Sequence, residues 1–454
     1  MRTVREQARD TPVVGEYDVC IIGGSCTGVF AAIRAARLGA KVAIIESNGF
    51  FGGTATASLV CIWHSIYDTT HERQIIAGLT TEVLDRLTRR RAVHLLQRNE
   101  WRYAILNTEE LKIELDEMVV EAGVRPFLHT VTVFASPVLQ DGRLAAVAVE
   151  DKTGRRAIAA SYVVDATGDG DVAARMGLPC YKRPAMQPPT TCLTICGIKE
   201  IEDRYPGFSL ERAAFDARYP QALKRGWLRT ADVPGATDDA VVNGTRIFGV
   251  DCSDADDLTQ AEIEGRRQAR AMCDILRENF PLPESVPLVA LPAKIGIRET
   301  RHVRCQHTLT EQGVLSGTRF PDAIANGSYR VDIHNAHGPG IVLRYLDGRE
   351  ERHSPAEPVV MGRWRPDSHD SPTLYQIPYR SLVPRGATNL LVAGRMIDAD
   401  EGAFGAARVM VNCNQMGEAA GAASYLALNG HSTVADVPIG KLRETLTAEG
   451  AIIV

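Results

Sequence analysis

The segment from Tyr17 to Glu46 constrains the fold more than any other part of this chain. Val19 to Ile22 form a short β-branched run that suits a buried parallel strand, and a glycine-rich turn follows at once. Apolar residues then recur at helical spacing, and a second apolar run over 41–45 ends at Glu46. This order of strand, turn, helix, strand and acid predicts a dinucleotide site, in which the helix N-terminus holds a pyrophosphate.

The acid at the end of the second strand fits the same interpretation. Glu46 lies 23 residues after Gly23, close to the roughly 20 expected for a carboxylate that binds a ribose hydroxyl. One position departs from the G-x-G-x-x-G fingerprint, because Ser25 occupies the place of its second glycine. A Cβ there should push the backbone away from the phosphates unless the serine hydroxyl itself forms a hydrogen bond with one.

Three later segments bear on the same site. The loop over 47–57 is rich in glycine and small residues, and Tyr162 to Asp171 read as a strand that ends in a glycine turn. Asn389 to Gly421 read as a buried strand, a loop and a long helix of small residues suited to close packing on a ligand or a sheet. Elsewhere the pattern predicts helices over 74–91, 108–123 and 259–279, and a hairpin turn over 140–143.

These segments together resemble the FAD-dependent oxidoreductases of the glutathione-reductase structural type. The form Glu46-x-x-Gly49-Phe-x-Gly-Gly-Thr-Ala-Thr is similar to a large, mostly uncharacterised group of that name. The resemblance covers about residues 15–185 and 285–430. It implies an α/β fold, with a Rossmann-like FAD-binding domain and a central parallel sheet, interrupted by a mixed α+β substrate domain. The expected division is an N-terminal extension over 1–15, the FAD-binding domain over 16–185 and 371–454, and the inserted substrate domain over 186–370.

The motif and the resemblance imply FAD as the cofactor. In the resemblance, the backbone near Thr130 and Val131 faces the adenine, and the start of the last helix lies under the pyrimidine edge of the isoalloxazine. The residues expected to bind the cofactor are Gly23, Gly24, Ser25, Cys26, Thr27, Gly28, Glu46, Ser47, Gly52, Gly53, Thr54, Ala55, Thr130, Val131, Ala166, Thr167, Gly168, Gly394, Arg395, Gly405 and Ala406.

Oxidation of a C–H bond beside oxygen or nitrogen also needs a base, and histidine has a suitable pKa. The candidates are His64, His302, His307, His334 and His337, and the sequence does not choose among them. Arg298 and Arg301 can share one helical turn, or face a common substrate carboxylate or phosphate from a loop; alternatively they pair with Glu299 and nearby acids. The predicted catalytic residues are therefore His64, His302, His334, Arg298 and Arg301. No metal site is expected, because Asp332, His334 and His337 lack a fourth partner.

The predicted function is a flavoprotein oxidoreductase, a dehydrogenase or an oxidase, that takes a hydride from a small polar organic substrate or delivers one to it. Two alternatives stay open: an FAD-dependent monooxygenase, and a non-redox or electron-relay use of the flavin. Residues 185–370 contain no second dinucleotide motif, so oxygen, a quinone or another protein is expected to accept the electrons.

The charge and the cysteine content limit the binding partners and the compartment that we expect. The net charge of −5 over 454 residues argues against nucleic acid and against an anionic membrane surface. Ten scattered cysteines without a C-x-x-C pair argue against zinc ribbons and iron–sulfur clusters, and a reducing cytoplasm is expected. Residues 1–16 lack the apolar core of a signal peptide, and no run approaches the ~18 apolar residues of a membrane span. A homodimer is expected on general frequency alone.

Overall fold

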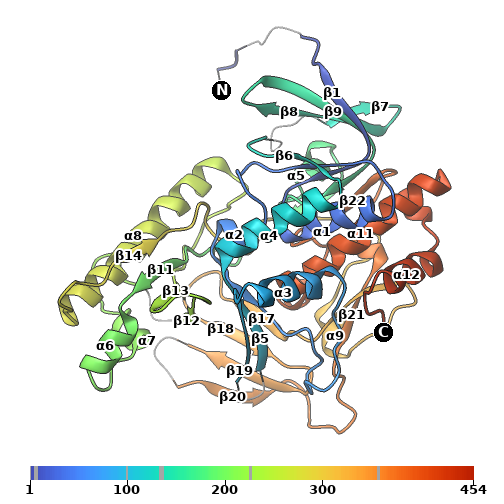
Figure 1. The fold of residues 1–454 in the computed structure, drawn as a ribbon. Coiled ribbons are helices and arrows are strands. Elements are labelled where there is room, and N and C mark those ends of the chain that lie inside the picture. Colours follow the sequence, from blue (N-terminus) through green and yellow to red (C-terminus); the bar gives the residue numbers. More distant parts are fainter. Residues whose placement is uncertain (1, 5–8, 99–100, 132–136, 224–227, 355–357) are drawn as a thin grey trace.

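The computed structural model describes residues 2–4, 9–98, 101–131, 137–223, 228–354 and 358–454 (Figure 1). Its centre is a seven-stranded sheet in the order β6-β2-β1-β9-β8-β7, with β22 also paired with β9. These strands are β1 (Val13–Ile22), β2 (Val42–Ile45), β6 (Arg125–Phe127), β7 (Pro137–Gln140), β8 (Arg143–Asp151), β9 (Gly154–Asp165) and β22 (Leu390–Val392). The predicted α/β class is thus confirmed.

The sheet is parallel where a nucleotide motif requires it and antiparallel at one end. Strands β6, β2, β1, β9 and β22 run parallel, whereas β8 pairs antiparallel with the first half of β9. The predicted turn between β7 and β8 is present, with φ angles of 51° at Asp141 and 76° at Gly142. Two consecutive positive φ angles match the twist of a tight hairpin. The hairpin therefore extends the main sheet.

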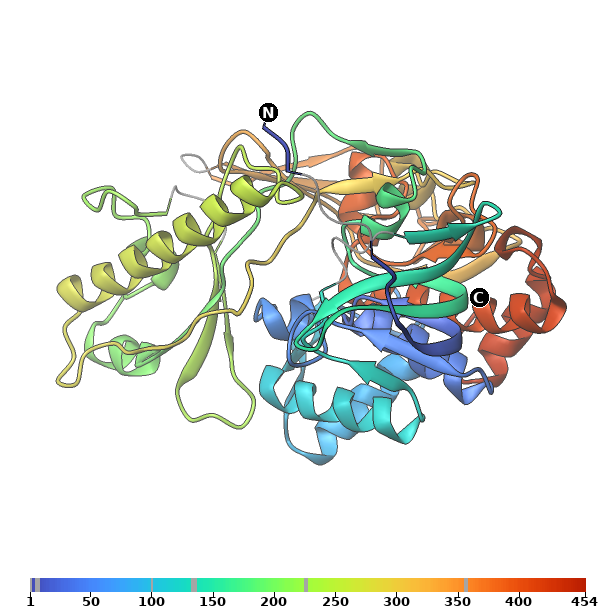
Figure 2. The ribbon, with the colours of Figure 1, turned by 90° about the horizontal axis from the view of Figure 1, so that it is seen from above.

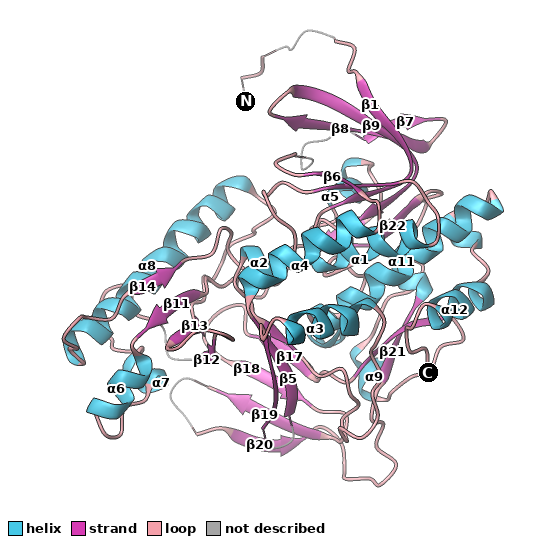
Figure 3. Ribbon diagram, in the orientation of Figure 1, coloured by secondary structure: helices cyan, strands magenta, loops and turns pink. Residues whose placement is uncertain are grey.

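Successive side chains of β1 pack into two different hydrophobic clusters, one on each face of the sheet. Val19 and Ile21 pack with the helices on one face, and Cys20 and Ile22 pack on the other face. Helices α1 (Cys26–Arg37), α4 (Thr108–Glu121) and α11 (Met410–Gly430) lie together over the first face (Figure 3). Helix α4 has the expected cap, because the Asn107 side chain accepts hydrogen bonds from the Glu109 and Glu110 amides.

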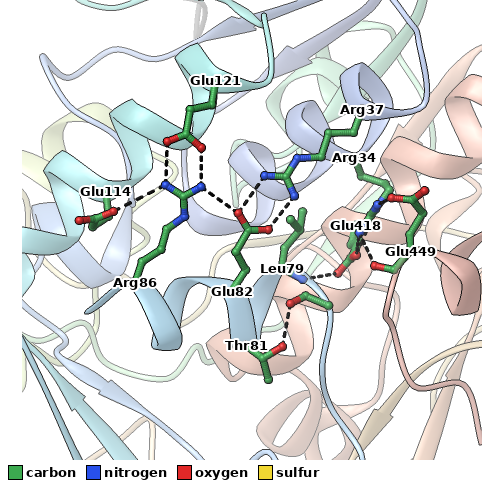
Figure 4. Close-up of polar contacts among 11 residues, drawn as sticks. Arg34, Arg37, Leu79, Thr81, Glu82, Arg86, Glu114, Glu121, Glu418 and Glu449 are labelled. Carbon is green, nitrogen blue, oxygen red and sulfur yellow. Dashed lines mark hydrogen bonds and ion pairs between the residues drawn. The ribbon is translucent and has the colours of Figure 1, made fainter. Parts of the chain in front are cut away.

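Helix α11 brings the end of the chain against its beginning (Figure 1). A Cβ on Gly417 would lie 2.0 Å from the Thr27 carbonyl oxygen, and one on Gly421 would lie 2.2 Å from that of Ala31. The small residues of α11 therefore pack closely against helix α1. A buried ion pair crosses the same interface: Arg34 Nε donates to Glu418 Oε1 at 3.1 Å, and Arg34 also pairs with Glu449 (Figure 4).

A second lobe stands beside this body, and Figure 2 shows it along helix α8. It contains a four-stranded antiparallel sheet in the order β12-β13-β11-β14 and has a hydrophobic cluster of its own. Its elements are β11 (Leu193–Cys196), α6 (Ile198–Arg204), α7 (Leu210–Ala213), β12 (Arg229–Asp232), β13 (Asp239–Asn243), α8 (Ala255–Asn279) and β14 (Leu288–Ala290). Helix α8 begins four residues before the predicted Thr259, because Asp254 caps it.

The remaining elements complete the main body. Buried residues over 309–383 share the hydrophobic cluster of α1 and α11, while the predicted boundary at 370 stays a prediction. Helix α3 begins at Leu79, later than the predicted residue 74, after Gly78 at a φ of 66°. The elements are α2 (Thr54–Ala57), β3 (Ile62–Trp63), α3 (Leu79–Arg89), β4 (Val93–Arg98), β5 (Trp101–Leu106), α5 (Asp171–Arg175), β10 (Cys180–Lys182), β15 (Arg301–Val303), α9 (Glu311–Leu315), β16 (Ala323–Gly327), β17 (Val331–His334), β18 (Ile341–Arg344), β19 (Arg349–His353), β20 (Val360–Arg363), β21 (Tyr375–Pro378), α10 (Glu401–Ala407) and α12 (Ile439–Ala448), with 3-10 turns at Tyr379–Leu382 and Val434–Asp436.

Candidate functional site

A cavity of about 950 Å³ opens at the carboxyl ends of β1, β9 and β22. This edge is where open α/β sheets bind their ligands, and the volume is at the upper end of the usual range for ligand pockets. Residues from both lobes line it, and the predicted cofactor residues among them are Gly23, Ser25, Cys26, Thr27, Glu46, Ser47, Gly52, Gly53, Thr54, Ala166, Thr167, Gly168, Gly394 and Arg395.

The glycine turn after β1 is tightly closed. Gly23 has a φ of +102°, and a Cβ on Gly28 would lie 1.8 Å from the Gly23 carbonyl oxygen. Ser25 caps helix α1, because its Oγ accepts a hydrogen bond from the Gly28 amide at 3.4 Å. Ser25, which departs from the fingerprint, thus caps helix α1 and keeps the start of this helix at the wall of the cavity.

Glu46 holds two neighbouring loops in place. Its Oε2 accepts a hydrogen bond from the Gly24 amide at 2.8 Å, and its Oε1 accepts one from the Asn48 amide at 2.7 Å. The next residue, Ser47, accepts a hydrogen bond from Lys294 Nζ at 2.7 Å. Glu46 is 7% exposed and lines the cavity, so it remains accessible to a ligand there.

The turn after β9 is built on a buried carboxylate. Asp165 accepts hydrogen bonds from the amides of Thr167 at 3.1 Å and Val172 at 2.9 Å. Burial raises the pKa of Asp165, and these hydrogen bonds act in the opposite direction. On the same side of the cavity, Arg395 pairs with Asp169 at 2.7 Å.

The helix expected to start near residue 405 is two helices. Helix α10 ends at Ala407, and α11 begins at Met410 after the break at Arg408 and Val409. Gly405 is closely packed under β17, where a Cβ would lie 2.7 Å from the Asp332 carbonyl oxygen. Neither Gly405 nor Ala406 lines the cavity; the lining residues here are Arg408, Val409, Met410, Cys413 and Asn414.

Several other predicted cofactor residues support the cavity from behind. Gly24 and Gly28 lie in the closed turn, Ala55 is buried, and the Thr130 amide donates to the Glu46 carbonyl oxygen at 3.0 Å. Val131 pairs with Glu150 at the end of the hairpin. None of these five is among the lining residues, so any cofactor contact by them stays a prediction.

Among the predicted catalytic residues, Arg301 lines the cavity and His302 does not. His302 is fully buried, with Nδ1 at 2.9 Å from the Ile397 carbonyl oxygen and Nε2 at 3.1 Å from Glu299 Oε1. Arg301 begins β15 and pairs with Asp171 at 3.0 Å. Arg298 lies in the preceding loop and donates to the Pro188 carbonyl oxygen at 2.6 Å. The two arginines thus do not share a helical turn, and Arg301 adopts the alternative of pairing with an acid.

The other three predicted catalytic residues line one end of the cavity. We define the inner chamber as the part lined by His64, Arg246, Arg298, Tyr329, Asp332, His334 and Arg408. Tyr329 donates to Asp332 Oδ2 at 2.7 Å, and the His64 ring lies 4.1 Å from the Tyr329 ring. His334 Nε2 lies 3.4 Å from Asp332 Oδ1, within ion-pair distance but outside hydrogen-bond geometry.

Electrostatics keep both histidines of the inner chamber neutral. Burial lowers the pKa of His334 well below its ordinary value, and the charge of Arg298 lowers it further. Burial likewise lowers the pKa of His64, with the charge of Arg229 acting in the same direction. Burial alone would raise the pKa of Asp332, but His334, Arg408 and Arg330 together outweigh burial and lower that pKa. A neutral histidine beside an ionised carboxylate is able to accept a proton.

Sequence reasoning missed several residues of the inner chamber. Arg246, Tyr329 and Arg408 lie in loops far apart in the chain, outside any motif. Asp332 was considered only as a metal ligand. The alternation of Val331, Asp332, Ile333 and His334 was the available signal, because it places both polar side chains on one face of a strand.

A comparison with protein-family models identifies the chain. The model described as "FAD dependent oxidoreductase" matches residues 18–446. The chain belongs to the FAD-dependent oxidoreductase family. The match spans both lobes, so the family membership applies to the whole cavity and not only to the glycine turn.

Curated relatives match only a short part of this flavoprotein. Mitochondrial dihydrolipoyl dehydrogenase of Schizosaccharomyces pombe is 55% identical over 80 residues, which is 15% of this chain and 16% of the relative. Dihydrolipoyl dehydrogenase of Trypanosoma brucei brucei is 49% identical over 43 residues, 10% of this chain and 9% of the relative. The chain therefore spans less than a fifth of the length of these relatives.

Solved structures are similar over most of the chain at low identity. A geranylgeranyl bacteriochlorophyll reductase-like protein of Thermoplasma acidophilum has a TM-score of 0.47 and 12% identity, covering 96% of this chain and 83% of the other. The p-nitrophenol 4-monooxygenase of Pseudomonas putida has a TM-score of 0.46 and 12% identity, covering 96% and 88%.

The residues present fit FAD. The closed turn at Gly23 and Gly28 leaves the start of α1 at the cavity wall, where a pyrophosphate is stabilised. Asn414 is 1% exposed, lines the cavity, and has no hydrogen-bond partner for either amide atom within the described part of the chain. Such a buried amide suits the polar edge of a flavin.

Among the described residues, no helix is long and apolar enough to cross a membrane.

Proposed function

We propose that this oxidoreductase transfers a hydride between its FAD and a small polar organic substrate bound in the inner chamber, as a dehydrogenase or an oxidase. One observation carries the proposal: a single cavity joins the glycine turn of α1 to His64, His334 and Asp332. A flavin bound along the turn would therefore share one enclosed space with two neutral histidines. The family membership supplies the cofactor, and the chamber supplies the acid–base groups.

The cofactor-binding residues are assigned by their place along the cavity. The start of α1 and the turn after β22 at Gly394 would hold the pyrophosphate, and Glu46 would accept hydrogen bonds from the adenosine ribose. The start of α11, with Met410 and Asn414, would contact the polar edge of the flavin ring. A helix N-terminus there favours the negative charge that a reduced flavin carries.

FAD, when bound, accepts two electrons and one hydrogen from the substrate as a hydride. The chain's own residues then have to remove a proton from the substrate O–H or N–H group, so that the oxidised product forms its new double bond. His334 is the proposed base. Its Nδ1 is buried without a hydrogen-bond partner among the described residues, and Asp332 lies 3.4 Å from its Nε2. Protonation of His334 would place a cation beside the Asp332 carboxylate, which stabilises it.

The electron acceptor, the assembly and the compartment complete the proposal. Oxygen, a quinone or another protein would reoxidise the flavin, because residues 185–370 contain no second dinucleotide motif. A homodimer remains the expected assembly. All ten cysteines are free, and burial raises the pKa of most of them, which suits a reducing cytoplasm.

The test is the visible spectrum of the purified protein, followed by anaerobic addition of candidate substrates. A yellow protein that releases FAD on denaturation, and that bleaches with one compound, supports the proposal. The His334→Asn variant should retain FAD yet bleach about a hundredfold more slowly with the same compound. A protein that takes up no FAD overturns the proposal. Bleaching only with a reduced nicotinamide, followed by oxygen insertion into a substrate, would favour the monooxygenase alternative.

A further inference from the structure

The inner chamber contains more positive charge than its own acidic residues balance. Arg246, Arg298 and Arg408 line it, and Asp332 is its single carboxylate within the described residues. Asp332 lies 3.9 Å from Arg408, and neither Arg246 nor Arg298 has a carboxylate at ion-pair distance in the part of the chain that is described. Two guanidinium groups thus face a largely buried space without a counter-ion.

The other acidic residues of the cavity have partners of their own. Asp169 pairs with Arg395, Asp171 with Arg301, and Glu262 with Arg266. Glu46 accepts hydrogen bonds from backbone amides, and Asp254 caps helix α8. These acidic residues therefore do not pair with the arginines of the inner chamber.

Two of these arginines also have a donor without a partner. Arg246 is 8% exposed, and its Nη1 donates to the Gly244 carbonyl oxygen at 3.1 Å while its Nε has no partner among the described residues. Arg408 donates to Gln187 Oε1 at 3.3 Å, and its Nε is likewise buried without a partner. Buried guanidinium donors that are not paired are costly, and an oxyanion removes that cost by accepting two parallel hydrogen bonds.

The pKa values are consistent with this arrangement. Burial, together with the charges of Arg408 and Arg246, lowers the pKa of Arg298 to about 9. Burial also lowers the pKa of Arg246 to about 10. Both shifts mean that the surrounding protein disfavours these two cations, and a bound anion would stabilise them.

We propose that the substrate carries an oxyanion, either a carboxylate or a phosphate, which Arg246, Arg298 and Arg408 bind while its oxidisable carbon lies beside His334. This inference rests on the proposed function and narrows its substrate to organic acids or phosphate esters. The arginines anchor the charged end of the molecule, and the rest of the cavity extends from that end toward the cofactor side. Arg301, which is paired with Asp171, takes no part in this anchor.

The test is isothermal titration of the FAD-loaded protein with succinate, with inorganic phosphate and with neutral succinamide. Succinate or phosphate should bind, and whichever binds more tightly identifies the kind of oxyanion; succinamide should not bind. Arg298→Gln and Arg246→Gln should each weaken that binding by about tenfold or more. The matched control is Arg266→Gln, an exposed member of an i,i+4 pair on α8, which should leave binding unchanged.

The thermal unfolding midpoint and the flavin content of each variant show whether it is correctly folded. Where Arg298→Gln does not retain FAD, Arg298→Lys replaces it, and the loss of the planar fork should still weaken binding by about threefold or more. The inference is overturned when neither anion binds to the yellow wild-type protein, when succinamide binds equally well, or when the arginine variants bind like wild type. A protein that takes up no FAD instead overturns the proposed function.

Discussion

Glu46 shows how one side chain serves both the fold and the cofactor. Its two oxygens accept hydrogen bonds from the Gly24 and Asn48 amides, and Ser47 Oγ donates to it at 3.0 Å. The Asn48 side-chain amide also donates to Oε1 at 2.7 Å, whereas Oε2 accepts only from the Gly24 amide among the described residues. Each carboxylate oxygen offers about two acceptor positions, so Oε2 retains one for a ribose hydroxyl. The same residue that positions the glycine turn can therefore also recognise what the turn binds.

Replacement of Glu46 separates these two roles. Glu46→Ala removes a charged acceptor and should weaken FAD retention by about 1.5 to 3 kcal/mol. Glu46→Gln keeps one oxygen acceptor and should lose less. The measurement is flavin fluorescence during serial dilution of the yellow protein. Retention by Glu46→Ala equal to wild type would falsify the assignment of this residue to the ribose.

Glu299 gives the protein a predictable sensitivity to acid. It is buried, lies 3.1 Å from His302 Nε2, accepts from the Gln187 amide at 3.0 Å and pairs with Arg183. Burial alone would raise its pKa, but the contacts with His302 and Arg183 outweigh burial and lower it. A lowered folded-state pKa stabilises the protein above the ordinary value near 4.5, and the contribution disappears as pH falls through the lower folded value.

We therefore expect Glu299→Gln to lower the free energy of unfolding at pH 7 by about 3 kcal/mol, with a smaller difference from wild type near pH 3.5. Urea unfolding at both pH values measures this. The exposed Glu401→Gln serves as the control and should stay within about 0.5 kcal/mol of wild type. An equal destabilisation at both pH values would show that the carboxylate charge is not responsible.

At the scale of elements, the contact between α1 and α11 decides the geometry of the cavity. Both helices begin at its wall, and the small residues of α11 allow the two backbones to approach closely. The composition of α11 predicted close packing, but not its start. The break at Arg408 and Val409 depends on packing under β17, which local helix propensity does not report.

Gly417→Ala tests this contact. The new Cβ would lie 2.0 Å from the Thr27 carbonyl oxygen, a backbone atom, so the helices have to separate. We expect a loss of about 1 to 3 kcal/mol in stability together with weaker FAD binding, measured by thermal unfolding and flavin titration. Gly430→Ala in the same helix is the matched control, because its Cβ would meet only the Ser432 side chain at 3.5 Å. A Gly417→Ala protein as stable as this control would contradict the close approach.

The ion pairs that join helix α1 to α11 and to α3 should contribute very different amounts to stability (Figure 4). Arg34 and Glu418 are each 2% exposed, whereas Arg37 and Glu82 are 30% and 28% exposed. Removal of one partner leaves a buried charge in the first pair and a hydrated charge in the second. Arg34→Met should cost about 3 to 5 kcal/mol, and Arg37→Met about 0 to 1 kcal/mol, in denaturant unfolding. Similar losses from both variants would show that burial does not set the value of the pair.

At the scale of the whole molecule, one part of the site is formed by residues close together in the sequence, and the other part by residues far apart in it. The glycine turn and Glu46 follow two strands within one short segment, so their order predicted that they belong together, and the family resemblance added the turn at Thr167. The inner chamber joins Arg246 of the second lobe to Asp332 and Arg408 of the main body. Nothing within a single segment indicates that these three meet, because only the packing of the two lobes brings them to one cavity.

This arrangement predicts that FAD stabilises the main body more than the second lobe. The cavity residues assigned to FAD come from 23–28, 46–54, 166–168, 393–395 and 409–414, which all belong to the main body, whereas the second lobe has its own hydrophobic cluster. At a free FAD concentration a hundredfold above its Kd, binding should add about 2.7 kcal/mol to the stability of whatever unfolds with the site. Hydrogen exchange with and without FAD measures this segment by segment. Protection should rise in α1 and α11 and stay unchanged in α6 and α7, because the buried residues of those short helices belong to the hydrophobic cluster of the second lobe. A uniform rise through both lobes would instead mean that the two unfold as one cooperative unit.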